Sequence, residues 1–360
     1  MSVDKINIFN RTKKDLEDFL KNESIKLFRK NQIWNWLYVQ GVKSFFEMNN
    51  LSLTLKEQLE KKFKISFLTV NKAFTSKDGT KKWLFKLNDG KEIETVFIPD
   101  GKRGTICISS QVGCSLSCSF CHTGTMKLER NLELEEIIGQ VITVKNFLKD
   151  WKKKTEEKIV TNIVFMGMGE PLLNYRNVIE AIKVLTDEKG LAISKRKITL
   201  STSGIVNKIK DFQRDTDINL AVSLHAANDK VRNELVPINK KWPIATLLEE
   251  LKIYNKLERK KRITFEYIML DGINDSLKDA KQLIKLVGPL KSKINLIPFN
   301  PWPNSSYDVS SNEKIEKFRN FILEKGKIIA TIRNPRGNDI LAACGQLKSF
   351  KKKNTIKEGL

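Results

Sequence analysis

The sequence predicts an α/β protein in which a small helical domain and a β-hairpin section precede a larger domain built on a parallel sheet or barrel. Apolar runs of strand length recur between helical stretches after residue 99, the pattern of repeated β and α elements. Apolar and polar residues alternate between residues 70 and 98, as in a hairpin. The 360 residues, 40% hydrophobic and 30% charged, are enough for one large globular domain and a smaller one.

The N-terminal section, residues 1–69, is predicted to be helical from about residue 11 to residue 66. Its apolar residues recur every three or four positions, so that each segment can bury one face. These residues are Leu16, Phe19 and Leu20, then Ile33, Trp36 and Leu37, and finally Leu55, Leu59 and Phe63. We expect a small accessory domain.

Residues 70–98 predict a β-hairpin connector. Trp83, Phe85 and Leu87 alternate with other residues and fall on one face of a strand. The Asp-Gly pairs at 78–79 and 89–90 are typical of tight turns.

Residues 99–347 are predicted to form one domain, because no long Gly/Ser linker divides them. The strand-like runs within it lie at 105–109, 162–165, 198–201, 220–224, 263–268, 294–297 and 328–332. The lysine-rich residues 348–360 are expected to form a mobile tail.

The net charge indicates an anionic partner. Lysine and arginine exceed aspartate and glutamate by 23, an excess that is spread through the chain. The summed field favours a polyanion, and nucleic acid is the first candidate, although a general lysine bias in an A/T-rich genome would give the same excess. No apolar run approaches the ~20 residues needed to cross a bilayer, and the N-terminus has no signal-peptide core. We therefore expect a cytoplasmic protein with no membrane contact.

Three of the five cysteines, Cys114, Cys118 and Cys121, follow the run at 105–109 with the spacing C-x3-C-x2-C. Three thiolates can hold a 4Fe-4S cluster and leave one iron open to bind a substrate. The alternative is a structural zinc site with His122 or a distant residue as fourth ligand, although neighbours in sequence are poorly placed to share one ion. The odd number of cysteines, without a signal peptide, argues against a permanent disulfide framework.

Polar residues follow several of the other predicted strands, at the strand ends where parallel α/β folds bind ligands. They are Gly169, Glu170, Ser201, Ser223, Leu224, His225 and Asn300, with Leu224 included as the middle residue of one motif. Glycine lets the backbone approach a ligand, and Glu170 can accept a hydrogen bond from an amine or a ribose hydroxyl. Helix capping is the alternative for the serines and Asn300, and a structural hydrogen bond for His225. Their placement beside the cysteines favours a shared cofactor pocket.

Cys107 and Cys344 complete the set of cysteines. Either alone could be an inert core residue. With the other motifs, they make the whole chain resemble the RlmN and Cfr family of radical S-adenosylmethionine (SAM) RNA methyltransferases. The matching stretches are CISSQVGCSLSCSFC at 107–121, FMGMGE at 165–170, SLH at 223–225 and ACGQL at 343–347. The resemblance implies a radical SAM partial (β/α)6 barrel for residues 99–347.

The resemblance also implies roles for individual residues. The open iron of a cluster on Cys114, Cys118 and Cys121 would chelate SAM. Gly169 and Glu170 would face the SAM amine, and the rest of the pocket would be lined by Ser201, Ser223, Leu224, His225 and Asn300.

Two further cysteines and a glutamate would carry the chemistry that the resemblance implies. One SAM would methylate the Cys344 thiolate, and a second would be cleaved to a radical that activates this methyl group. Cys107 would release the product by forming a disulfide with Cys344. Glu94 matches the family glutamate near the proton step, and a solvent-facing strand carboxylate is the alternative interpretation.

The family divides by target atom, carbon 2 of an adenine in the RlmN branch and carbon 8 in the Cfr branch. The stretches 169–174, 201–204 and 333–337 are similar to the RlmN branch, which acts on large-subunit (23S) ribosomal RNA and on transfer RNA next to the anticodon. We therefore expect these RNAs as partners, held by the N-terminal domain and the lysine runs, an electron donor such as flavodoxin, and a monomer. The alternatives are a carbon 8 methyltransferase, a radical SAM protein activase, and a non-catalytic basic RNA-binding protein with a structural metal site.

Overall fold

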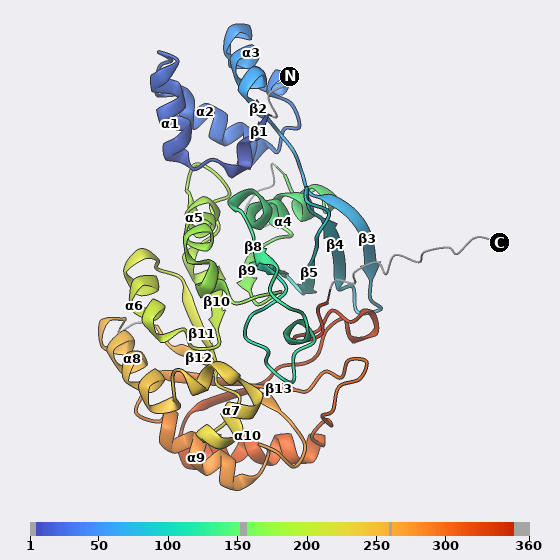
Figure 1. Cartoon of the computed structure of the whole chain (residues 1–360), viewed down its shortest axis with the longest axis vertical. Helices are drawn as coiled ribbons and strands as arrows, with labels where there is room; N and C mark the ends of the chain where they lie inside the picture. The colour runs from blue at the N-terminus through green and yellow to red at the C-terminus, as the bar shows by residue number, and fades with distance from the viewer. Residues whose placement is uncertain (1–4, 152–156, 259–260, 349–360) are drawn as a thin grey trace, which may run out of the picture.

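A ten-stranded mixed sheet organises the chain (Figure 1). The computed structural model describes residues 5–151, 157–258 and 261–348. Along the sheet the strands follow the order β14-β13-β12-β11-β10-β9-β6-β5-β4-β3. The part from β14 to β6 is parallel, whereas β6, β5, β4 and β3 pair antiparallel with one another. The α/β class predicted from the sequence is confirmed.

The parallel strands lie where the apolar runs predicted them. They are β6 (Arg103–Cys107), β9 (Asn162–Phe165), β10 (Ile198–Thr202), β11 (Asn219–Ser223), β12 (Ile263–Met269), β13 (Ser292–Pro298) and β14 (Ile329–Ile332). Each predicted run agrees with one strand to within two residues at either end. The run at 105–109 ends early as a strand because the Ser109 N–H donates to the Gln140 side chain (2.7 Å) instead of continuing the ladder with β5.

The parallel part of the sheet curves into an open barrel. One cavity of about 490 Å³ is lined by residues of β6, at one end of the parallel array, and of β14, at the other, as well as by strands between them. Strands at opposite ends can share a cavity only if the sheet bends around it. Within the described residues β14 pairs with β13 alone, so the barrel is not closed by strand pairing.

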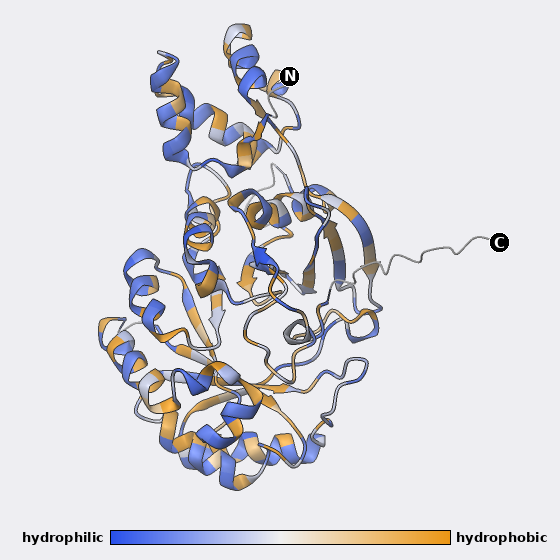
Figure 2. Cartoon of the chain, in the orientation of Figure 1, coloured by the Kyte–Doolittle hydropathy of each residue, from blue (hydrophilic) through white to orange (hydrophobic). Residues whose placement is uncertain are grey.

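Helices cover the outside of this barrel. They are α4 (Leu134–Phe147), α5 (Tyr175–Thr186), α6 (Val206–Asp215), α7 (Asp229–Leu235), α8 (Ile244–Leu257), α9 (Leu277–Val287) and α10 (Asn312–Gly326). In α5, the buried residues Val178, Ile179, Ile182 and Leu185 recur at helical spacing and form the inward face. In Figure 2 these helices carry both polar and apolar residues. No helix in the described ranges is long and apolar enough to cross a membrane.

The hairpin section continues the same sheet. Strands β3 (Thr69–Thr75), β4 (Lys81–Lys86) and β5 (Glu92–Asp100) are joined by turns at both Asp-Gly pairs. The expected boundary at residue 98 falls inside β5, which pairs directly with β6. Both faces of β4 are buried from Lys82 to Phe85.

The N-terminal helices form a separate layer at the top of Figure 1. They are α1 (Lys13–Asn22), α2 (Arg29–Asn35), a π-helical turn (Trp36–Gln40) and α3 (Leu53–Lys62), and strands β1 (Ile6–Asn7) and β2 (Phe63–Lys64) pair beside them. Thr12 caps α1 in a capping box with Asp15. An ion pair between Lys13 and Asp187 (2.7 Å) links this layer to the segment after α5.

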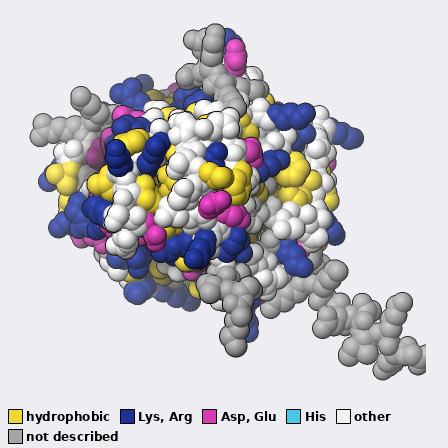
Figure 3. Space-filling model, turned by 90° about the horizontal axis from the view of Figure 1, so that it is seen from above, with side chains coloured by type: hydrophobic (Ala, Val, Ile, Leu, Met, Phe, Trp, Pro, Cys, Tyr) yellow, Lys and Arg dark blue, Asp and Glu magenta, His cyan; other side chains and the backbone are white. Residues whose placement is uncertain are grey.

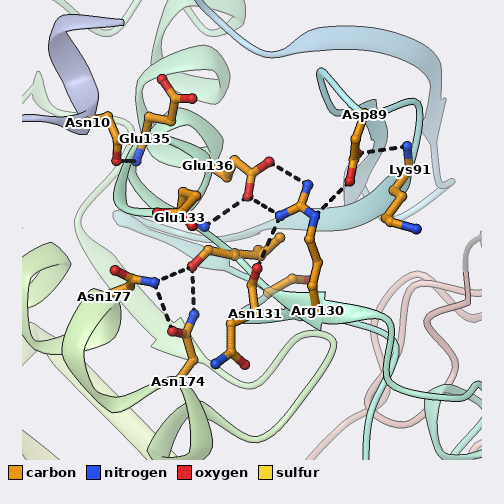
Figure 4. A network of polar contacts seen from close by, with 12 residues as sticks. Asn10, Asp89, Lys91, Arg130, Asn131, Glu133, Glu135, Glu136, Asn174 and Asn177 are labelled. Atoms are coloured by element: carbon orange, nitrogen blue, oxygen red, sulfur yellow. Dashed lines mark hydrogen bonds and ion pairs between the residues drawn. The ribbon is translucent and has the colours of Figure 1, made fainter. Parts of the chain in front are cut away.

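A polar network anchors the start of α4 to its surroundings (Figure 4). Arg130 binds Glu136 through two parallel hydrogen bonds (2.7 and 2.8 Å) and also contacts Asp89 in the β4–β5 turn. The Asn174 amide donates to the carbonyls of Ser110 and Leu132, at 2.8 Å each. These contacts fix the segments that surround the cysteine loop, residues 114–121.

Candidate functional site

The cysteine loop leaves the carboxyl end of β6 and lies between two short strands, β7 (Gln111–Val112) and β8 (Arg130–Asn131), which pair with each other. Cys114, Cys118 and Cys121 all line one cavity of about 150 Å³, here called the cysteine cavity. Burial raises the pKa of Cys114 to about 12 and, helped by Cys121 and Cys114, raises that of Cys118 well above its ordinary value. The three thiols thus interact electrostatically, and each would lose its proton only beside a positively charged group.

The arrangement suits a multi-iron cluster better than a single ion. In the parts of the chain that the structure describes, no three histidine, cysteine, aspartate or glutamate side chains are placed to bind one metal ion. A 4Fe-4S cluster uses a different iron for each thiolate and so spaces its ligands more widely. His122, the candidate fourth zinc ligand, stacks on Trp302 with ring centroids 4.7 Å apart and does not line the cysteine cavity.

Gly169 and Glu170 form part of the wall of this cavity. Gly169 has φ +92°, and a Cβ there would lie 2.5 Å from the Cβ of Gln111, so only glycine fits. The Glu170 carboxylate accepts hydrogen bonds from the N–H groups of Leu172 (3.1 Å) and Ser203 (2.8 Å). Burial raises the pKa of Glu170 to about 7, and these two bonds oppose the rise.

Ser201 and Ser223 lie on neighbouring strands and face the same cavity. Their hydroxyl oxygens are 3.3 Å apart. A pair of hydroxyls at this distance can donate to and accept from a sugar hydroxyl or a carboxylate.

His225 also lines the cysteine cavity, and it has a structural bond as well. Its Nδ1 accepts a hydrogen bond from the Ile268 N–H (3.1 Å), so the ring proton resides on Nε2. Burial, together with Arg232, lowers the pKa of His225 to about 3. The ring is therefore neutral and offers an N–H donor.

Two residues of the predicted pocket are placed elsewhere. Leu224 is fully buried in the core and lines neither cavity. Asn300 lines the 490 Å³ cavity inside the barrel, here called the barrel cavity, and its Nδ2 donates to the Cys344 carbonyl at 3.2 Å. Within the part of the chain that the structure describes, the buried Asn300 Oδ1 has no hydrogen-bond partner.

Cys344 lines both cavities, whereas Cys107 lines the barrel cavity only. Both are free cysteines in the structure. Burial, together with the nearby Cys344, raises the pKa of Cys107 to about 12. A negative charge on Cys344 in turn raises the pKa of Arg333. Cys344 is thus the thiol that connects the cysteine loop with Cys107.

Four residues that the sequence predictions did not include in the site line both cavities as well: Met166, Glu266, Ile297 and Arg333. Glu266 is buried in β12. Its Oε1 accepts a hydrogen bond from Asn295 (3.1 Å), while its Oε2 has no hydrogen-bond partner among the described residues. The sequence did contain a signal for Glu266, because it is a carboxylate in the middle of the apolar run Ile263–Met269. Burying a charge is costly, so such a residue is usually kept for a function.

Glu94 lies on β5 and lines neither of the two cavities. It is 4% exposed, so the interpretation as a solvent-facing carboxylate is wrong. Its Oε1 pairs with Lys82 Nζ (3.0 Å), and its Oε2 accepts from the backbone N–H of Lys348 (2.9 Å). Burial raises the pKa of Glu94 and Lys82 opposes the rise.

Comparisons with known proteins agree with this geometry. Residues 108–286 match the model of the radical SAM superfamily, and residues 6–65 match the model of the ribosomal RNA large subunit methyltransferase N-terminal domain.

Curated relatives are similar over most of their length. The chain is 51% identical over 330 residues to a dual-specificity RNA methyltransferase RlmN of Parvibaculum lavamentivorans, covering 89% of this chain and 82% of that protein. It is 49% identical over 352 residues to the protein of the same name from Roseobacter denitrificans, covering 96% and 89%. The crystal structure of a radical SAM methyltransferase from Sphaerobacter thermophilus superimposes with a TM-score of 0.88 at 39% identity, covering 95% of this chain and 99% of that one.

Proposed function

The chain belongs to the RlmN family of radical SAM RNA methyltransferases, and from this membership we propose that it methylates carbon 2 of an adenine in 23S ribosomal RNA and in transfer RNA. The observation that carries the proposal is the position of Cys344 between the two cavities. A methyl carrier has to meet the methyl donor on one side and the target base on the other. The methyl donor would lie in the cysteine cavity, and the target base would lie in the barrel cavity.

The residues of the cysteine cavity fit the cofactors of this family. Cys114, Cys118 and Cys121 would hold a 4Fe-4S cluster with one open iron, and SAM would occupy the remaining space. When bound, these groups supply a methyl group and a reductively generated radical. Glu170 would hold the amine of SAM, while Ser201, Ser223 and the Nε2–H of His225 would orient its other polar groups. Gly169 keeps the wall free of a side chain.

Cys344 acts first as a nucleophile and then as a carrier. Its thiolate takes a methyl group, and Arg333 stabilises the negative charge that this step needs. After the sulfur-bound carbon has joined carbon 2 of the adenine, protein and RNA are covalently linked.

Cys107 releases the product from this link. Its thiolate attacks the sulfur of Cys344, an S–S bond forms, and the S–C bond breaks with its electron pair left on the carbon, which then takes a proton. We assign to Glu94 the removal of the carbon 2 proton. The Lys348 N–H that now occupies its Oε2 has to leave before the carboxylate can accept that proton.

The remaining parts of the proposal concern partners and domains. We assign RNA binding to residues 1–69 and to the lysine runs, a connector to residues 70–98, and the reaction to residues 99–347. The RNA presents an unstacked adenine, because a base inside a helix cannot reach the barrel cavity. A flavodoxin-like donor supplies the electron, and one copy of the chain suffices. The residues beyond Lys348, assigned to a basic tail, lie outside the described part of the chain.

The decisive experiment is anaerobic incubation of the reconstituted protein with SAM, a reductant and a 23S ribosomal RNA fragment. Nucleosides are analysed by mass spectrometry, and protein is analysed on a denaturing gel. We expect 2-methyladenosine from the wild type and an RNA–protein adduct through Cys344 in Cys107→Ala. Serine-for-cysteine variants of the cysteine loop serve as controls that lack the cluster.

Each other outcome contradicts a specific part of the proposal. An 8-methyladenosine product would place the protein in the Cfr branch. Methylation by Cys107→Ala at the wild-type rate would remove Cys107 from the release step. Absence of SAM cleavage by protein with a correctly assembled cluster would refute the radical mechanism.

A further inference from the structure

The segment that carries Cys344 is held at both ends by one buried ion pair. We call residues 341–348 the Cys344 loop. Lys82 Nζ donates to the carbonyl oxygen of Leu341, at the start of the loop, at 3.0 Å. The Glu94 Oε2 accepts from the N–H of Lys348, at its end, at 2.9 Å. Lys82 and Glu94 themselves form an ion pair of 3.0 Å.

This ion pair is well shielded from water. The side chains of Lys82 and Glu94 are 8% and 5% exposed. They face each other from adjacent strands, where Leu84 of β4 is directly opposite Glu94 of β5. The Lys82 ammonium also lies 5.4 Å from the centre of the Phe74 ring. A buried pair of this kind is costly to disrupt from one side, because the remaining charge is left without a partner.

The middle of the loop is held by other contacts. The His122 N–H donates to the Gly345 carbonyl (2.7 Å), and the Thr123 hydroxyl donates to the Leu347 carbonyl (2.6 Å). Leu341 and Gly345 have φ +52° and +82°, the left-handed values that allow a tight loop. The loop is therefore held by His122 and Thr123, the two residues directly after the cysteine loop, and by β4 and β5 at its ends.

We propose that Lys82 is a positioning residue that, with Glu94, fixes both ends of the Cys344 loop and so keeps the Cys344 sulfur within reach of both the cysteine cavity and Cys107. Neither residue touches Cys344, so the effect passes through the backbone at residues 341 and 348. Without Lys82, the Leu341 carbonyl at the start of the loop loses its hydrogen-bond donor. The Glu94 carboxylate also loses the ammonium group that holds it in place. The link to methyl transfer rests on the proposed function, whereas the link to the Cys107–Cys344 pair does not.

The test is the thiol–disulfide equilibrium of Cys107 with Cys344 in the full-length protein. Samples are equilibrated in glutathione buffers, where one oxidised glutathione and the protein dithiol give the protein disulfide and two reduced glutathiones. The fraction oxidised is read by alkylation and mass spectrometry. We expect Lys82→Met to lower the equilibrium constant for disulfide formation about tenfold, which equals about 30 mV. When the start of the Cys344 loop is no longer held, the sulfurs of Cys107 and Cys344 are close enough to bond for a smaller fraction of the time.

Three further measurements make the outcome specific. Lys86→Met, which changes an exposed lysine on the same strand, should leave the equilibrium unchanged. Lys82→Arg should restore most of the loss, because a guanidinium can reach both the Leu341 carbonyl and Glu94. Hydrogen exchange should become faster at the amides of residues 341–348 in Lys82→Met and remain the same in β9 to β13.

A folded Lys82→Met protein, by circular dichroism, whose equilibrium constant lies within twofold of the wild type would overturn the inference. If Lys82→Met does not fold, Lys82→Gln, which keeps a donor for the Leu341 carbonyl, should give an intermediate shift, and no shift would also overturn it. Because no RNA is present, these results are independent of whether the wild type methylates RNA.

Discussion

Cys344 is the residue on which the proposed chemistry depends, and its surroundings follow from ordinary packing. It follows a strand on the edge of the sheet and sits in a short loop with little side-chain bulk, between Ala343 and Gly345. The small neighbours leave its sulfur open to two cavities. Cys107, by contrast, lies within β6 and is buried. The Cys344 thiol therefore faces both cavities, whereas the Cys107 thiol faces the barrel cavity alone.

The two histidines of the chain allow a direct test of the electrostatics at the residue scale. The pKa of His225 is lowered to about 3, so its ring should remain neutral from pH 8 to pH 5, with the proton on Nε2. Nitrogen-detected NMR of the cluster-free protein should show no titration of this ring in that range.

The same shift predicts a dependence of stability on pH. In the unfolded chain the ring binds a proton near pH 6.5, whereas in the folded protein it does so only near pH 3. The folded state is therefore favoured above pH 6.5 and loses this contribution as the pH falls toward 3. His225→Gln should flatten the fall of the melting temperature between pH 7 and pH 4. An equally steep fall in the variant would contradict the assignment.

The sequence allowed some of these residues to be predicted and not others, for a physical reason. Cysteines at short spacing and polar residues after strands are local patterns, so they can be read in one dimension, and six of the seven pocket residues proved to line one of the two cavities. Leu224 lies between Ser223 and His225, which both line the cysteine cavity, and its own side chain is buried in the core. The Glu94 carboxylate pairs with Lys82 on the adjacent strand and also accepts from the N–H of Lys348, and no spacing in the sequence encodes this second, distant contact.

At the scale of elements, α7 holds two strand ends in place through Arg232. This side chain is 1% exposed. Its Nε donates to the Leu224 carbonyl (3.0 Å), and its Nη2 donates to the carbonyls of Ser203 (2.8 Å) and Ser223 (3.1 Å). The ends of β10 and β11, which carry the serine pair, and the loop that carries His225 are thereby tied to one helix.

Replacing Arg232 with methionine should therefore destabilise the protein by about 2–4 kcal/mol, because several buried carbonyls lose their donor. Urea denaturation followed by circular dichroism measures the change. Arg214→Met is the matched control, since that arginine is exposed and pairs with Asp211 and Asp215 at the surface. Equal stability of the two variants would show that the loops after β10 and β11 are held by other contacts.

The strands and helices themselves were predictable because each one follows a local period of apolar residues. Strand ends were less so. The run at 105–109 includes Ser109, whose backbone is bound to Gln140 of α4 and not to a neighbouring strand. A boundary between the hairpin section and the barrel was expected from the change in pattern, yet β5 and β6 pair across it. Which strands pair depends on contacts between segments in the folded chain, and the order of apolar and polar residues along the sequence does not contain this information.

At the scale of the whole molecule, the net positive charge governs how the protein associates with an RNA. The excess of 23 basic residues is not confined to one patch. Figure 3, the view from above, shows lysine and arginine side chains spread over that face with fewer acidic ones between them. A basic face of this kind attracts RNA of any sequence, whereas recognition of one adenine requires the cavities.

RNA affinity should therefore depend strongly on salt. We expect the Kd for a 23S ribosomal RNA fragment, measured by fluorescence anisotropy, to rise by at least about tenfold between 50 and 200 mM KCl, as two or three phosphate contacts already require. A single-stranded RNA without the target adenine should show a similar slope with weaker binding. A Kd that does not change with salt would mean that the basic residues take no part in binding.

The chain crosses the open side of the barrel only after its last described strand. Beyond β14, the Gly337 N–H binds Asp78 and the Asp339 carboxylate binds Ser76, which brings the chain back to the hairpin at the far end of the sheet. During translation all ten strands leave the ribosome before residues 333–348 do. The segment that carries Cys344 is thus the last part of the cavity walls to be put in place. Until residues 333–348 fold back onto the hairpin, the side of the barrel cavity that they line remains open to solvent.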